Sequence, residues 1–222
     1  MENLMHERVF GHLALHYLPG DEQPARRLLE LMGCTLVDNG PDPGRDGFCT
    51  VLVDQAEANY ADNIFFLSRV SDEQLAIEQA IRAALTSTDR NAALVASYRT
   101  KTTAAPESIS HIGIRYGSFG ALEEALLAIE RDTATGGALE GRAQVVKYRA
   151  RPGLDEEIDA RLAASPAFRG DERPAFANSW VQCFVTTDVL GFGILALGHT
   201  FELDFVFEPF FAEPPSFGAP RR

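Results

Sequence analysis

An internal repeat restricts this chain to folds that are built from two similar units. The segments GHLALHYLPG, from Gly11, and SHIGIRYGSFG, from Ser110, both place a histidine first in a short alternating strand that ends in tyrosine. Each segment is followed by a pattern typical of an amphipathic helix, DEQPARRLLELMG and SFGALEEALLAIERD. Asp21 and Ser118 are predicted to cap these helices. Both copies therefore begin with a strand and a helix.

Three strand-like segments follow the helix in each copy, so the sequence predicts a βαβββ module twice. The first copy continues with CTLVDNG, FCTVLVD and NIFFLSRV, and the second with AQVVKYRA, WVQCFVTT and HTFELDFVF. We therefore predict an α+β fold in which the two modules pair into a curved mixed sheet that forms a cup. This division gives a first module at 1–70, a helical connector at 71–107, a second module at 108–210 with a helical insertion near 152–179, and a Pro-rich tail at 211–222.

The composition excludes some classes of function. A net charge of −12 over 222 residues disfavours binding to nucleic acid or to an anionic membrane. The three cysteines form no CxxC pair, and the first residues lack the apolar stretch of a signal peptide, so we expect free buried thiols in a soluble cytoplasmic protein. The expected partner is a small-molecule substrate. Because one chain already supplies both modules, a cup does not require a homodimer, and the oligomeric state stays open.

The last strand-like segment has two different faces. Thr200, Glu202 and Asp204 share one face, whereas phenylalanine and leucine side chains occupy the other. A buried carboxylate without a partner would be very costly, so the acidic face is expected to look into water, a polar cavity or a metal site.

The repeat and the stretch GHTFELDF resemble the vicinal oxygen chelate superfamily, which includes glyoxalase I, extradiol ring-cleaving dioxygenases and bleomycin-resistance proteins. This resemblance implies a metal-binding cup whose ligands in this chain would be His12, His111 and Glu202. In glyoxalase I a further carboxylate comes from the first module, but that position is Phe66 here. The departure favours the dioxygenase-like set of two histidines and one carboxylate.

Two imidazoles and one carboxylate leave adjacent metal positions open, which suits Fe(II), with Mn(II) or Zn(II) as alternatives. The expected activity is that of an extradiol-type dioxygenase acting on a small aromatic or enolic substrate. A glyoxalase-like lyase or isomerase and a non-catalytic, bleomycin-resistance-like binding protein remain open. A third alternative is a cup that only stabilises dimerisation.

Two more side chains are candidates for catalysis because they share the ligand face by strand parity. His16 could transfer a proton, and Arg115 could bind a substrate carboxylate or enolate. Lys147 and Gln182 are further candidates whose facing the pattern does not determine, and His199 is predicted to lie in a loop.

Each of these residues also has an ordinary structural interpretation. The histidines could be strand residues with ordinary hydrogen bonds, and the two carboxylates Glu202 and Asp204 could pair with Arg115 or Lys147. The glycines show no phosphate-binding spacing, and no nucleophile elbow is present.

Overall fold

The computed structural model describes residues 10–38, 48–55, 63–170, 172–175 and 179–207. The first unit consists of β1 (His12–Tyr17), α1 (Glu22–Leu31), β2 (Thr35–Asp38), β3 (Cys49–Leu52) and β4 (Ile64–Arg69). Two helices follow, α2 (Asp72–Thr86) and α3 (Asp89–Ala104), and then the short 3-10 turn η1 (Pro106–Ser108). The second unit consists of β5 (His111–Arg115), α4 (Phe119–Thr133), β6 (Ala143–Arg149), α5 (Glu156–Ala163), β7 (Arg173–Pro174), β8 (Trp180–Thr187) and β9 (His199–Val206).

The two units have the same strand plan. Within the described residues, the first sheet has the order β1-β4-β3-β2 and the second the order β5-β9-β8-β6-β7. In each unit the first strand pairs in parallel with the last, while the middle strands are antiparallel. The predicted α+β class is confirmed, although hydrogen bonding divides these strands into two sheets and not one. The predicted tail at 211–222 lies outside the described residues.

The strand register supports the alignment of the repeats. Ala14 pairs with Phe66 in the first unit, and Gly113 pairs with Glu202 in the second. In both units the small residue lies two positions after the first histidine of the strand. Phe66 and Glu202 therefore occupy equivalent positions, as predicted.

The helix starts follow the predicted capping residues only in part. Ser118 accepts a hydrogen bond from the backbone N–H of Ala121 at 3.1 Å, as an N-cap does. Asp21 holds the N-cap position of α1, but its side chain makes no cap bond and instead forms an ion pair with Arg142 of the second unit. At this helix start, an ion pair between the two units takes the place of the local cap hydrogen bond.

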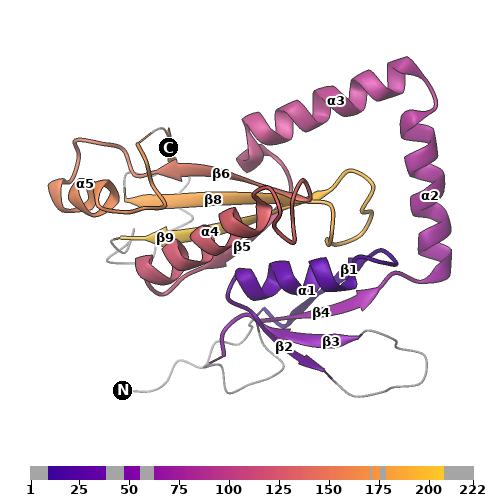
Figure 1. The fold of residues 1–222 in the computed structure, drawn as a ribbon, viewed down its shortest axis with the longest axis horizontal. Helices are drawn as coiled ribbons and strands as arrows, with labels where there is room; N and C mark the ends of the chain where they lie inside the picture. The colour runs from indigo at the N-terminus through magenta and orange to yellow at the C-terminus, as the bar shows by residue number, and fades with distance from the viewer. Residues whose placement is uncertain (1–9, 39–47, 56–62, 171, 176–178, 208–222) are drawn as a thin grey trace, which may run out of the picture.

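The core runs through both units without a break. Helices α1 and α4 pack against each other, and their buried leucines join the apolar faces of both sheets in one cluster. The hydroxyl of Tyr116 donates to the backbone oxygen of Met32 at 2.7 Å, and Arg27 pairs with Asp132 at 2.7 Å. These bonds join the second unit to the first, where α1 and α4 lie side by side (Figure 1).

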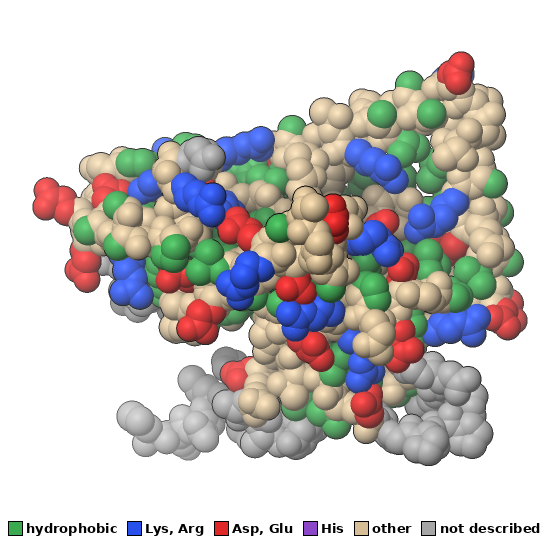
Figure 2. Space-filling model, in the orientation of Figure 1, with side chains coloured by type: hydrophobic (Ala, Val, Ile, Leu, Met, Phe, Trp, Pro, Cys, Tyr) green, Lys and Arg blue, Asp and Glu red, His purple; other side chains and the backbone are tan. Residues whose placement is uncertain are grey.

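Helices α2 and α3 form a helical arm. In Figure 1, α2 runs away from the end of β4 and α3 returns toward the second unit. The Ser71 hydroxyl accepts a bond from the Gln74 N–H, but the Gln74 side chain donates to Gly193 O, so these two residues form only half of a capping box. No helix in the described part of the chain is both long and apolar enough to span a bilayer. Acidic and basic side chains are interspersed on the face drawn in Figure 2.

Candidate functional site

The chemistry-bearing residues of the second unit gather on the face of its sheet that α4 does not cover, here called the open face. Alternation along the strands sends Phe201 and Leu203 into the core, where both are fully buried, and leaves Glu202 partly accessible. His111 and Gln182 belong to the same face and come from the strands on either side of β9. The predicted two-sided character of this strand is confirmed.

His111 and Glu202 are in direct contact on the open face. The imidazole Nε2 lies 3.0 Å from the carboxylate Oε2, and Nδ1 lies 2.6 Å from the backbone oxygen of Ile109. A proton on Nδ1 satisfies that carbonyl, so Nε2 is the nitrogen directed at the carboxylate. The second oxygen, Oε1, accepts a 2.7 Å hydrogen bond from Gln182. A further partner thus holds each member of the pair in place.

This geometry fits two states of the pair. A second proton on His111 would make it an imidazolium–carboxylate ion pair. Alternatively, two neighbouring corners of an octahedron with bonds of about 2.1 Å are about 3.0 Å apart, so the two atoms are also spaced as adjacent ligands of one cation. Ligand histidines commonly donate their other N–H to a carbonyl, and ligand carboxylates are hydrogen-bonded in turn. Ile109 and Gln182 supply both of these supports.

His12, the third predicted ligand, lies in the first sheet. Its ring packs against Phe66 with 4.8 Å between the ring centroids, and its side chain is exposed. No group of three or more His, Cys, Asp or Glu side chains in the described ranges is close enough to hold one metal ion. The structure thus brings His111 and Glu202 together and leaves His12 apart from them, and the three-ligand site stays a prediction.

Arg115 and Asp204 form a second pair next to the first. Arg115 Nη2 lies 3.2 Å from Asp204 Oδ2, and the guanidinium carbon lies 5.5 Å from the centre of the Trp180 ring. The arginine side chain is 62% exposed, whereas that of Asp204 is 9% exposed. The structural interpretation of Asp204 as a partner of Arg115 is confirmed, and the outer side of the guanidinium remains open to solvent.

Of the three other candidates, Lys147 and His16 lie elsewhere. Lys147 projects from the opposite face of β6 and binds Glu130 Oε1 at 2.8 Å and the backbone oxygen of Ala167. Gln182, by contrast, belongs to the open face. His16 is half-buried in the first sheet, where its Nδ1 lies 3.2 Å from the Ser68 hydroxyl and burial lowers its pKa.

The prediction that His199 is a loop residue is wrong. His199 is the first residue of β9 and pairs with Thr187 of β8. Its ring packs on Phe192 and bonds to the backbone oxygen of Ile194 at 2.7 Å. Gly191, which has no Cβ, allows the β8–β9 loop to fold back against the imidazole.

Two adjoining hollows flank the His111–Glu202 pair. One, of about 390 Å³, is lined by Glu107, Tyr148 and Phe184 together with His111, and the other, of about 340 Å³, by Arg115 and Trp180. Gln182 and Glu202 line both hollows. The Tyr148 hydroxyl donates to Glu107 Oε2 at 2.7 Å, which connects η1 to the sheet.

Sequence reasoning missed these aromatic walls. Trp180 and Phe184 have the same strand parity as Gln182, so the facing of Gln182 would have placed them on the open face. Glu107 comes from the connector and carries no comparable signal.

No family model, curated protein or solved structure matches this chain. The assignment of a function therefore depends on the residues of this chain alone.

Proposed function

We propose that the protein is a metal-dependent enzyme of the vicinal oxygen chelate type, which acts on a small aromatic or enolic substrate on the open face of the second sheet. The carrying observation is the 3.0 Å separation between His111 Nε2 and Glu202 Oε2, with Ile109 and Gln182 holding the two groups. His111 and Glu202 are the proposed ligands. His12, the further ligand that the sequence predicts, lies apart from this pair.

The donor set suits Fe(II) first, with Mn(II) or Zn(II) as alternatives, because one imidazole and one carboxylate are borderline to hard ligands. When bound, such an ion would supply Lewis-acid activation of neighbouring substrate oxygens and, in the case of Fe(II), reaction with dioxygen. The protein would hold the ion and the substrate in position and supply the side chains around them.

The surrounding side chains fit a flat substrate with an anionic oxygen. Tyr148 and Phe184 wall one side of the pair and Trp180 the other. Arg115 can direct N–H donors at a carboxylate or enolate through the side of its guanidinium that Asp204 does not cover. Burial raises the pKa of Tyr148, and its hydrogen bond to Glu107 acts in the same direction, so the phenol stays protonated.

Metal content tests this proposal. Wild type, Glu202→Gln and Asp204→Asn would be purified without chelator, loaded with Fe(II) under anaerobic conditions, desalted and analysed for metal per chain. Asp204→Asn is the matched control, because Asp204 lies on the same strand and face but pairs with Arg115.

We expect about one equivalent of metal in wild type and in Asp204→Asn, and loss of that metal in Glu202→Gln. Oxygen uptake would then be screened with catechols and enols. Retention of the metal by Glu202→Gln, or no metal in any of the proteins, would overturn the proposal. Metal without oxygen uptake would favour a glyoxalase-like lyase or isomerase.

A non-catalytic small-molecule-binding protein is the second candidate. It is favoured by the separation of His12 from the other two predicted ligands. It is also favoured by the pairing of Glu202 and Asp204 with basic side chains, which needs no metal ion. In that case no stoichiometric metal would be found, and small aromatic acids would still bind and be displaced from the open face.

The cysteines support the proposed cytoplasmic location. All three thiols are free and buried, and burial raises the pKa of Cys34 to about 12 and that of Cys49 to about 11. Free protonated thiols are typical of a reducing compartment.

A further inference from the structure

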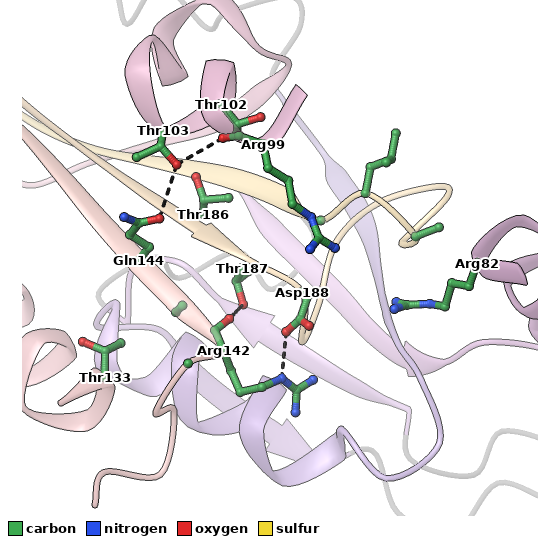
Figure 3. Close-up of a pocket in the computed structure, with 15 residues that line it drawn as sticks. Arg82, Arg99, Thr102, Thr103, Thr133, Arg142, Gln144, Thr186, Thr187 and Asp188 are labelled. Atoms are coloured by element: carbon green, nitrogen blue, oxygen red, sulfur yellow. Dashed lines mark hydrogen bonds and ion pairs between the residues drawn. The ribbon is translucent and has the colours of Figure 1, made fainter. Parts of the chain in front are cut away.

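A separate hollow of about 460 Å³ lies between the helical arm and one end of the second sheet. None of its described lining residues lines the hollows around His111 and Glu202. Figure 2 shows basic side chains beside the recess between the arm and the rest of the molecule. In Figure 3, Arg82 from α2 and Arg99 from α3 point into the hollow, while Arg142 lies across from them beside Asp188.

The positive charge of this hollow is only partly neutralised. Arg142 is paired twice, with Asp188 at 2.8 Å and with Asp21 at 2.9 Å. Neither Arg82 nor Arg99 forms an ion pair with a carboxylate in the described part of the chain. Moreover, Arg82 Nε is buried and has no hydrogen-bond partner among those residues. The buried Nε of Arg82 thus lacks an acceptor, and the exposed Arg99 has no carboxylate partner among the described residues.

Glu78, one turn before Arg82 on α2, does not supply the missing acceptor. Its side chain is fully buried, and its Oε1 accepts a 2.6 Å hydrogen bond from the backbone N–H of Leu195. Its other oxygen, Oε2, is buried without a hydrogen-bond partner, and no ion pair joins Glu78 to Arg82 in the described ranges. The carboxylate thus fixes the β8–β9 loop against the arm and leaves the arginine uncompensated.

Four of the five threonines in the described lining are already occupied as donors. The hydroxyls of Thr102, Thr103, Thr133 and Thr187 each donate to a backbone oxygen, and Thr186 shares a hydrogen bond with Thr200. What the hollow still lacks is an acceptor with several oxygens for the guanidinium groups. Arginine binds phosphate and carboxylate through paired N–H donors, so an anion is the chemistry that completes this lining.

We propose that this hollow binds a small organic anion that bears a phosphate or carboxylate group, with Arg82 and Arg99 as its principal donors. Its volume is that of a small-molecule site, about 300–1,000 Å³. Ala196 and Leu197 supply an apolar wall for the remainder of the ligand. The net charge of −12 repels large polyanions, which leaves a small anion as the occupant.

The site would also couple the arm to the body of the protein. Arg82 and Arg99 belong to different helices of the arm, whereas Asp188 and Leu197 belong to the second unit. A bound anion would therefore stabilise the docked position of the arm. This proposal is independent of the metal site.

Calorimetric titration with inorganic phosphate and with citrate at low ionic strength tests the site. The proteins compared are wild type, Arg82→Gln and Arg99→Gln. Arg90→Gln is the control, because Arg90 is an exposed arginine at the start of α3 that does not line the hollow. Sodium chloride at matched ionic strength serves as the blank. Glu202→Gln is included because phosphate and citrate also bind metal ions.

We expect saturable binding of at least one of the two probes by wild type, Arg90→Gln and Glu202→Gln, and binding at least about tenfold weaker in Arg82→Gln and Arg99→Gln. Tighter binding of phosphate would assign the site to phosphate esters, and tighter binding of citrate to polycarboxylates. No saturable binding of either probe, or an equal loss in Arg90→Gln, would overturn the site. Loss in Glu202→Gln alone would assign the anion to the metal site.

Discussion

The two units of this chain share a backbone plan and differ in what the sheet faces opposite α1 and α4 carry. Opposite the small residue of the first strand stands Phe66 in the first unit and Glu202 in the second. Two positions further along, the first unit pairs His16 with Ser68, whereas the second pairs Arg115 with Asp204.

This difference separates what determines the fold from what determines the chemistry. The strand alternation and the helix stripes are alike in both units, so both fold into βαβββ. A single exchange of phenylalanine for glutamate then decides what each first-strand histidine meets. His12 packs on an aromatic ring, which itself stacks on Phe48, while His111 meets a carboxylate. Only the second unit thus has a pair of ligand-type side chains in contact at this position.

The largest expected effect tests whether the two units form one cooperative structure. Leu28 in α1 and Leu126 in α4 are both fully buried in the common core. Leu28→Ala and Leu126→Ala should each lower the free energy of unfolding by about 2–5 kcal/mol, because each leaves a cavity. Urea unfolding followed by circular dichroism should show one transition that both substitutions move.

Leu94→Ala on the exposed side of α3 is the control for this experiment. The Leu94 side chain is 61% exposed, so its loss should change the free energy of unfolding by less than about 0.5 kcal/mol. Two separate transitions, each moved by only one of the core substitutions, would show that the units unfold independently.

The next effect tests whether metal binding belongs to the second unit alone. His111→Ala should weaken metal affinity by more than about 100-fold, because it removes a ligand, and Gln182→Ala by about 10–100-fold, because it removes a support of Glu202. His12→Ala should change the affinity less than about tenfold, since His12 lies apart from the pair. Metal-competition titration measures all three. Equal losses in His12→Ala and His111→Ala would instead support the three-ligand set.

The fold was predictable because its signals are local. Period-two alternation, the apolar helix stripes and the repeated histidine strand are visible without knowledge of tertiary contacts. The same parity placed Glu202 on a polar face. The equivalence of Phe66 and Glu202 followed from the repeat and agrees with the register.

The surroundings of the site were less predictable because they depend on contacts between elements. Strand parity alone does not say which face of β6 or β8 is uncovered, so Lys147 and Gln182 could not be distinguished. Glu107 reaches the site only because η1 packs against the sheet. Arg82 and Arg99 converge only because the helical arm folds back, and no residue spacing in α2 or α3 predicts this.

The smallest effect concerns the pH dependence of the first unit. Burial lowers the pKa of His16, and a hydrogen bond to the Ser68 backbone partly opposes that shift. The unfolded chain therefore binds a proton at a higher pH than the folded chain does. Stability from this group is complete above the unfolded pKa of about 6.5 and is lost as the pH falls through that value toward the folded pKa.

The urea midpoint of wild type should accordingly decrease as the pH is lowered from about 7.5 to about 5.5. The midpoint of His16→Gln should decrease less. Burial also lowers the pKa of His199, so the urea midpoint of His16→Gln should still depend on pH. The double variant His16→Gln with His199→Gln should lose more of this pH dependence. Identical slopes in wild type and His16→Gln would mean that His16 titrates alike in the folded and unfolded chains.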